Sequence, residues 1–352
     1  MNNKVMLFSD IHVHPHKRSQ QRLDDCLNAL GWVFDKASEA GVRDILFGGD
    51  LFHDRQKIEV YTYQRVFEIL SEKLSGGQFR LVLLLGNHDL WYNDRTTVSS
   101  VTPLSALPGV TIVSKPSRLS IAGSNWDFIP FTHNPVETLE ELKVMPGEPK
   151  YALGHIAVDG AVLHGTQTAD VAIEHDGDMV RISPALFSHY RHTFLGHYHA
   201  EQRVNLKVEY IGSPLQLSFG EAFQQKHIIL FDCETGERDY IVNDFSPKHL
   251  IISPEDREKY DLNGNFVQLR VDSISSTDLV AVRREMQSSA GMASLEIRQQ
   301  KKLIEEHVIS DAKALLSQGD ELLARYAHEV GHNGLDLDKL LSVGRSICQK
   351  TE

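Results

Sequence analysis

The sequence is poor in cysteine and has no long apolar run. Its three cysteines, Cys26, Cys233 and Cys348, are far apart and form no CxxC pair, which argues against a disulfide framework and against a thiolate zinc site. No apolar stretch approaches the roughly 20 residues of a membrane helix, and the N-terminus lacks the features of a signal peptide. We therefore expect a cytoplasmic protein without membrane contact.

An excess of positive charge is also missing. The chain has 36 Lys and Arg against 48 Asp and Glu, a net charge of −12, so it lacks the basic footprint of a protein that grips nucleic acid by itself. This counts against DNA as a substrate without excluding it, because bound divalent cations or a partner protein can supply the positive charge.

What is present is the pattern of a layered α/β protein. The 352 residues are 41% apolar and 24% charged, values that permit a large core and more than one domain. Apolar runs at 5–9, 44–49 and 80–86 alternate with helical patterns at 21–40 and 60–74, which predicts strands and helices in alternation. Residues 119–242 look richer in strands and turns, and a polar, proline-containing stretch at 244–254 suits a domain junction. Beyond it we expect a strand, a helix and a strand, then two helices, at about 310–330 and 336–348.

Candidate ligand residues lie just past the ends of these apolar runs. They occur in the tracts SDIH, GGDLFHD, GNHD, LGH and GHYH, and they are Asp10, His12, Asp50, Asn87, His155, His197 and His199. Ligands bind beyond the carboxyl ends of strands in α/β sheets, so these side chains are candidates for one shared site.

The residue types suit a pair of divalent cations. Two carboxylates, an asparagine carbonyl and several imidazoles make an oxygen and nitrogen set without sulfur, which favours Mn²⁺, with Mg²⁺, Fe²⁺ or Zn²⁺ as alternatives. Two such ions, bridged by a carboxylate, stabilise an in-line phosphoryl displacement and lower the pKa of a bridging water. The pattern therefore favours hydrolysis of a phosphate ester by activated water.

The five motifs DxH, GDxxxD, GNHD, GH and GHxH, in this order from Asp10 to His199, resemble those of the calcineurin-like metallophosphoesterases. The segment YIGSPLQLSFGEAF at 210–223 is similar to the one that follows the last ligand in SbcD-type DNA-repair nucleases, including phage recombination nuclease subunits. The resemblance implies a four-layer α/β/β/α core with a small α+β capping domain and C-terminal helices. It divides the chain into a nuclease domain at 1–248, a capping, DNA-recognition domain at 249–305 and an ATPase-binding helical region at 306–352.

The resemblance also assigns roles to residues. One metal would be held by Asp10, His12, Asp50 and His199, and the other by Asp50, Asn87, His155 and His197, with Asp50 as the bridge. His88 corresponds to the catalytic histidine that contacts the scissile phosphate and protonates the departing 3′ oxygen. His53 is a second catalytic candidate with a supporting role.

Of the tract FSDIHVHPH, only His12 is predicted to be a ligand. His14 and His16 follow it at alternate positions, and with Pro15 between them the chain is expected to leave the site. Six further histidines have no motif around them and are expected to be ordinary surface or core residues: His133, His164, His175, His189, His192 and His227.

The predicted function is a two-metal DNA nuclease, an exonuclease that could also be an endonuclease, in a bacterial or phage-infected cell. The resemblance implies an SMC-like, SbcC-type ATPase partner bound through the C-terminal helices, and a homodimer. The alternative within the superfamily is a phosphodiesterase or phosphatase acting on a small nucleotide or a phosphoprotein. A phosphatase is disfavoured because Leu85, not Arg, precedes GNHD and because GDLFHDR replaces GDxVDRG. A scaffold that has lost its chemistry is disfavoured because every ligand position is filled.

Overall fold

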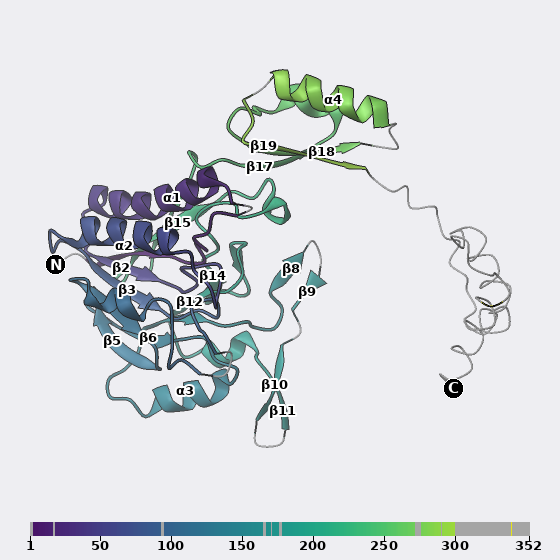
Figure 1. Ribbon diagram of the computed structural model, residues 1–352. Coiled ribbons are helices and arrows are strands. Elements are labelled where there is room, and N and C mark those ends of the chain that lie inside the picture. Colours follow the sequence, from purple (N-terminus) through teal and green to yellow (C-terminus); the bar gives the residue numbers. More distant parts are fainter. Residues whose placement is uncertain are drawn as a thin grey trace. The chain divides into compact units, whose positions relative to one another are not determined.

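The computed structural model describes residues 3–16, 18–92, 95–164, 167–169, 171–175, 178–271, 276–289 and 291–299, together with Lys339 (Figure 1). Residues Met1–Gln299 form one compact unit. Apart from Lys339, the two helices predicted after residue 306 lie outside the described residues. No helix in the described ranges has the length and apolar character needed to cross a bilayer.

The first sheet contains the apolar runs that were predicted to be strands. Its order is β16-β15-β1-β2-β3-β4, with β1 to β4 parallel and β15 antiparallel to β1. The bounds are β1 Lys4–Phe8, β2 Asp44–Phe47, β3 Arg80–Leu84, β4 Val110–Val113, β15 His227–Asp232 and β16 Arg238–Val242.

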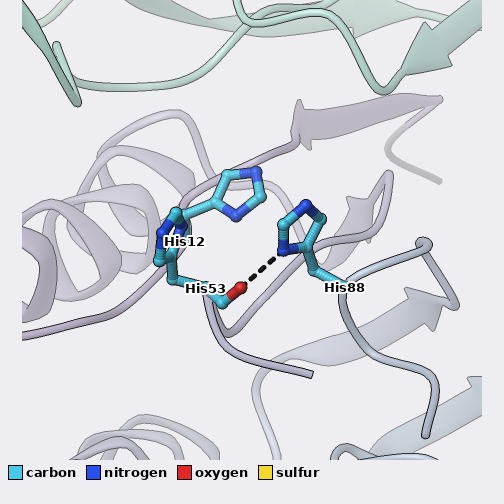
Figure 2. A group of neighbouring side chains, drawn as sticks. All are labelled: His12, His53 and His88. Atoms are coloured by element: carbon cyan, nitrogen blue, oxygen red, sulfur yellow. Dashed lines mark hydrogen bonds between the residues drawn. The ribbon is translucent and has the colours of Figure 1, made fainter. Parts of the chain in front are cut away.

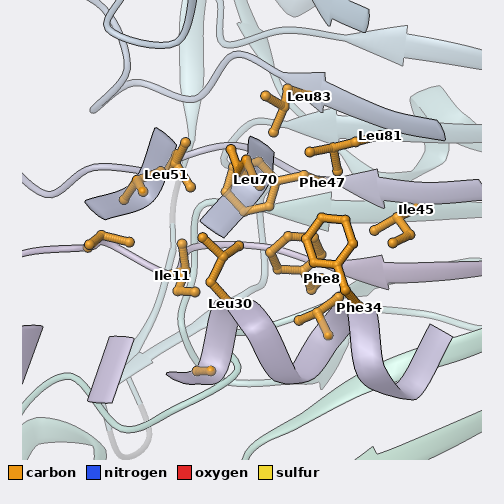
Figure 3. Packing of buried hydrophobic residues seen from close by; sticks show 14 of the residues in the cluster. Phe8, Ile11, Leu30, Phe34, Ile45, Phe47, Leu51, Leu70, Leu81 and Leu83 are labelled. Carbon is orange, nitrogen blue, oxygen red and sulfur yellow. The ribbon is translucent and has the colours of Figure 1, made fainter. Parts of the chain in front are cut away.

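Two helices cover one face of this sheet, α1 (Gln20–Glu39) and α2 (Val60–Leu74). The Ser19 side chain caps α1 by accepting from the Arg22 backbone N–H at 3.3 Å, which satisfies a donor that the helix leaves unpaired. Phe8 and Phe47 of the strands pack with Leu30 and Phe34 of α1 in one buried cluster (Figure 3).

The second sheet packs against the opposite face of the first. Its order is β13-β14-β12-β7-β6-β5, and its bounds are β5 Ser117–Ile121, β6 Ser124–Ile129, β7 Tyr151–His155, β12 His192–Gly196, β13 Gln202–Arg203 and β14 Val208–Tyr210. Val5 and Leu7 of β1 share a buried cluster with Trp126 and Phe194 of this sheet. Successive strand residues point to opposite faces, so β1 serves both this cluster and the one beneath the helices.

A third helix, α3 (Pro135–Lys143), covers the outer face of the second sheet, where Leu139 and Leu142 pack on Ala152 and Leu195. The layers therefore run helix, sheet, sheet, helix, as predicted. Shorter elements complete this part: β8 Val162–His164, β9 Gln167–Thr168, β10 Ala172–His175, β11 Asp178–Arg181, η1 Thr102–Ala106, η2 Pro184–Phe187 and η3 Phe219–Glu221.

The small α+β unit has a sheet of its own. Parallel strands β17 (His249–Ile252), β18 (Phe266–Val271) and β19 (Ser294–Gln299) lie in that order, with α4 (Ser276–Ser289) between β18 and β19 in the chain and η4 (Pro254–Lys259) after β17. The predicted strand–helix–strand unit is present, with β17 as an added strand. The proposed boundaries at 248 and 305 stay predictions.

Candidate metal centre

The seven predicted ligands lie where strands of both sheets end. Asp10 and His12 follow β1, Asp50 follows β2 and Asn87 follows β3, while His155 ends β7 and the two histidines of GHYH follow β12. Within each sheet these strands are parallel neighbours, so their carboxyl ends share one edge. The structure brings all seven side chains together there, in two groups.

One group gathers around His12. Its Nε2 lies 3.1 Å from Nε2 of His199, 3.5 Å from Oδ2 of Asp50 and 4.0 Å from Oδ1 of Asp10. Ligand atoms of Asp10, His12 and His199 all lie within 4.8 Å of one another. Two imidazole nitrogens that face each other at 3.1 Å need a proton or a cation between them, so this donor set fits a bound metal ion.

A second group gathers around Asn87. Its Oδ1 lies 3.0 Å from both His155 Nε2 and His197 Nδ1, and His155 Nε2 is 3.3 Å from Oδ2 of Asp50. Asp50 Oδ2 therefore approaches an imidazole of each group, the position that a bridging carboxylate requires. The oxygen and nitrogen donors without sulfur fit hard or borderline divalent ions.

The backbone is strained at this edge. Asp10, His12, Asp50 and His197 have φ values of +54°, +46°, +62° and +103°, and each such residue costs about 1–3 kcal/mol. Strain of this kind clusters at functional sites. Gly49 (φ +105°) needs to be glycine, because a Cβ would lie 2.5 Å from His155 Nδ1.

Asp89, the last residue of GNHD, ties two loops of the site together, a role that its motif alone did not indicate. It is fully buried and accepts hydrogen bonds from backbone N–H groups of Gly86, Asp50 and Leu51 at 2.9, 2.8 and 3.0 Å. Burial, with Asp50 adding to it, raises the pKa of Asp89 to about 7. The sequence feature that could have pointed to Asp89 is its position directly after His88, the predicted catalytic histidine.

His88 is oriented by two backbone contacts. Its N–H donates to Asp50 Oδ1 at 2.7 Å, and its ring Nδ1 lies 2.5 Å from the carbonyl oxygen of His53. A carbonyl can only accept, so Nδ1 carries a proton and Nε2 is left to act on other groups. Figure 2 shows His88 across from His12 and His53, with its ring bonded to the His53 carbonyl, and nitrogens of the three rings lie within 4.8 Å of one another.

His14 and His16 lie beside His53 and outside the groups that could hold a metal among the described residues. His14 Nε2 pairs with Asp54 Oδ2 at 3.1 Å, and the His16 ring centroid is 5.0 Å from that of His53. Burial lowers the pKa of His16 to about 3. After His12, the tract FSDIHVHPH therefore lies against the loop that contains His53 and Asp54.

Electrostatics couple Asp50 to His155. Burial acts to raise the pKa of Asp50, but the imidazoles of His155, His12 and His88 together outweigh it and hold that pKa well below its usual value. Burial likewise disfavours charge on His155, yet Asp50 raises the His155 pKa to about 9. A proton on His155 thus supplies positive charge between the buried carboxylates, a role that a bound divalent cation also fills.

Glu221 is a second residue whose role the sequence did not indicate, although it lies within the segment YIGSPLQLSFGEAF. Its Oε1 accepts from Nδ1 of His199 at 3.0 Å. Burial opposes its charge, but the bond to His199 and the nearby Lys226 lower the Glu221 pKa to about 2.

Comparison with known proteins identifies the family of this chain. The model of the calcineurin-like phosphoesterase family matches residues 3–201. The chain is 25% identical over 243 residues to Exonuclease subunit 1 of Enterobacteria phage T4, covering 68% of each chain. It is 23% identical over 271 residues to the SbcD subunit of the nuclease SbcCD of Bacillus subtilis (strain 168), covering 66% of this chain and 67% of the relative. The resemblance seen in the five motifs is confirmed, and the chain belongs to the calcineurin-like phosphoesterases, a family of metal-dependent hydrolases.

Proposed function

We propose that this protein is a two-metal-dependent DNA nuclease, an exonuclease that could also cut internally, and the nuclease subunit of a repair or recombination complex with an ATPase. The observation that carries the proposal is the position of Asp50, whose Oδ2 lies within 3.5 Å of His12 Nε2 and within 3.3 Å of His155 Nε2. A carboxylate between two imidazole groups is the arrangement that a bridged pair of ions needs. The nuclease names of both relatives support a nucleic acid as the substrate, and we propose that it is DNA.

The ligand roles follow the two groups. Asp10, His12 and His199 would hold one ion, Asn87, His155 and His197 would hold the other, and Asp50 would contact both. When bound, two ions of this kind, most suitably Mn²⁺, supply positive charge to the transferring phosphoryl group and lower the pKa of the attacking water.

His88 would act on the leaving group. With Nδ1–H held by the His53 carbonyl, Nε2 is the atom that can carry a second proton and donate it to the departing 3′ oxygen. His53 would support the same phosphate. Its backbone carbonyl fixes the His88 ring, and its own ring centroid lies 5.7 Å from that of His88.

A partner would reconcile the acidic chain with a DNA substrate. Both relatives are named as subunits, which supports assembly with a second protein. We propose an SMC-like, SbcC-type ATPase that binds residues 306–352, and a homodimer of the nuclease chain.

The first test is nucleotide release from end-labelled linear duplex DNA by the purified protein in Mn²⁺, beside a His88→Ala variant shown to bind metal normally. We expect the variant to release nucleotides about 10²–10⁴-fold more slowly, the usual contribution of a general acid. Equal release by the two proteins would contradict the role of His88. If neither cleaves DNA but the wild type hydrolyses bis(p-nitrophenyl) phosphate, the alternative of a phosphodiesterase with another substrate is favoured.

The partner has its own test. Deleting the residues after Gly334, which lie outside the described ranges apart from Lys339, should abolish binding to an SbcC-type ATPase and leave hydrolysis of a small phosphodiester intact. Loss of both together would contradict a separate docking segment.

A further inference from the structure

The segment from Ser213 to Lys226 follows β14 and contributes no proposed metal ligand, yet it contains a buried polar cluster beside the metal centre. Ser213, Glu221 and Lys226 are 1%, 7% and 5% exposed. Buried charges are costly unless they are paired, so the contacts of this cluster need an explanation.

Glu221 contacts a proposed ligand directly. Its Oε1 is 3.0 Å from Nδ1 of His199, while the other nitrogen of that ring faces His12 Nε2 at 3.1 Å. An ionised carboxylate only accepts hydrogen bonds, so Nδ1 must carry the proton and Nε2 must present a lone pair toward the metal site.

The second carboxylate oxygen is fully engaged on the opposite side. Glu221 Oε2 lies 2.7 Å from Lys226 Nζ and 3.2 Å from both Ser213 Oγ and the Leu217 backbone nitrogen. Lys226 Nζ also donates to the backbone carbonyl of His199 at 2.8 Å and to Ser213 Oγ at 2.9 Å. The cluster thus contacts His199 at both its ring and its backbone. Because both oxygens of Glu221 are used in these contacts, Glu221 is not a metal ligand itself.

We propose that Glu221 is a positioning residue for the metal centre, which fixes the tautomer and orientation of His199 and is itself held in place by Lys226 and Ser213. The inference rests on the proposed function, because it takes His199 as a ligand. Carboxylates that accept from the outer nitrogen of a ligating histidine fix its tautomer and raise its basicity, and their loss commonly costs about 10–100-fold in metal affinity.

The chain offers a matched control in Glu209. This carboxylate is also buried, at 0% exposure, and it also lies between a histidine and a cation: His192 Nε2 at 3.5 Å and Arg238 Nη1 at 2.8 Å from Oε2. His192 is not a proposed ligand. Glu221→Gln and Glu209→Gln therefore remove the same charge from similar surroundings, and only the first touches the metal centre.

The experiment is a Mn²⁺ titration of the full-length protein, followed by electron paramagnetic resonance of the free ion. We expect wild type and Glu209→Gln to bind two ions alike, and Glu221→Gln to lose about 10–100-fold in affinity at one site only. The same substitution in a His199→Ala background should cause little further loss, because residues that act through one another are not additive. Full additivity, equal weakening of both sites or no change would overturn the proposal.

Two arms keep the test decisive. If circular dichroism shows that Glu221→Gln does not fold, the double variant Glu221→Gln/Lys226→Met carries the same expectation, because it leaves no uncompensated buried charge. The titration needs no DNA, so a protein that fails to cleave DNA can still support the role of Glu221. A wild type that binds fewer than two ions would instead contradict the proposed function itself.

Discussion

The two ends of strand β12 carry the same three kinds of residue and put them to different uses. At the first residue of the strand, His192 lies beside Glu209 and Arg238. Just beyond its last residue, His199 lies beside Glu221 and Lys226. Each cluster has a buried carboxylate between an imidazole and a cationic side chain.

The clusters differ in what remains for a ligand. Arg238 Nη1 lies 2.8 Å from Nε2 and 3.3 Å from Nδ1 of His192. It donates to whichever nitrogen carries the lone pair, so this imidazole has no lone pair left for a ligand and the cluster is closed. His199 turns one nitrogen toward His12, in a region where Asp10 and Asp50 add negative charge. A histidine is therefore structural where its neighbours satisfy it, and it is a candidate ligand where unshared electron pairs converge at the carboxyl ends of strands.

The largest effect is expected when the negative charge of Asp50 is removed from the metal centre. Asp50→Asn should slow phosphodiester hydrolysis on the order of 1000-fold, because several kcal/mol of transition-state stabilisation by the ions would be lost. Hydrolysis rate and bound Mn²⁺ would be measured together. Asp54→Asn in the same motif, whose partner is His14, is the control and should keep both ions. An Asp50→Asn variant with two ions and a normal rate would show that this carboxylate is no bridge.

A smaller effect is expected at the closed cluster, and it should concern stability. Arg238→Met leaves Glu209 with Arg203 as its remaining cation, at 3.5 Å. The free energy of unfolding should fall by up to about 3 kcal/mol, the lower end of the range for breaking a buried pair. Urea denaturation measures it, and the folded variant should bind Mn²⁺ as the wild type does. Weakened metal binding would mean that the two ends of β12 are coupled.

The smallest effect concerns pH. His227 contacts Tyr240 at 4.8 Å between ring centroids, and the Tyr240 hydroxyl reaches Glu209. Burial, assisted by Lys226, lowers the pKa of His227 from 6.5 to about 4. Between pH 6.5 and 4, His227 therefore binds a proton in the unfolded chain but not in the folded chain. The stability that is present above pH 6.5 is lost as the pH falls toward 4.

His227→Phe removes this titration. In chelator, its free energy of unfolding should fall less than that of the wild type between about pH 7 and about pH 4.5. Parallel curves for the two proteins would contradict this, because they would mean that His227 takes up its proton equally in the folded and the unfolded chain.

Much of the fold and of the candidate site could be predicted from the sequence. The apolar runs ending at Phe8, Phe47 and Leu84 marked the parallel strands, and the ligand types after them marked the shared edge. Glu221 and Asp89 could not be assigned in this way, because the contact that defines each role is with a residue 22 or more positions away: His199 for Glu221, and the Asp50 backbone for Asp89. The sequence also did not show that His14 and His16 lie against His53, because His53 belongs to another loop.

The sequence by itself determined the strand rhythm, the order of the five motifs and the chemical kind of each donor, because periodicity and residue type are local properties. The tertiary structure alone decided which histidines face one another, which are closed off by a carboxylate and a cation, and where the backbone adopts a positive φ. These depend on packing two sheets face to face, which brings residues as distant as Asp10 and His197 into hydrogen-bond contact. The motif GHYH already separated His199 from His192, but only this packing supplies Arg238, which donates to His192, and directs a ring nitrogen of His199 toward His12.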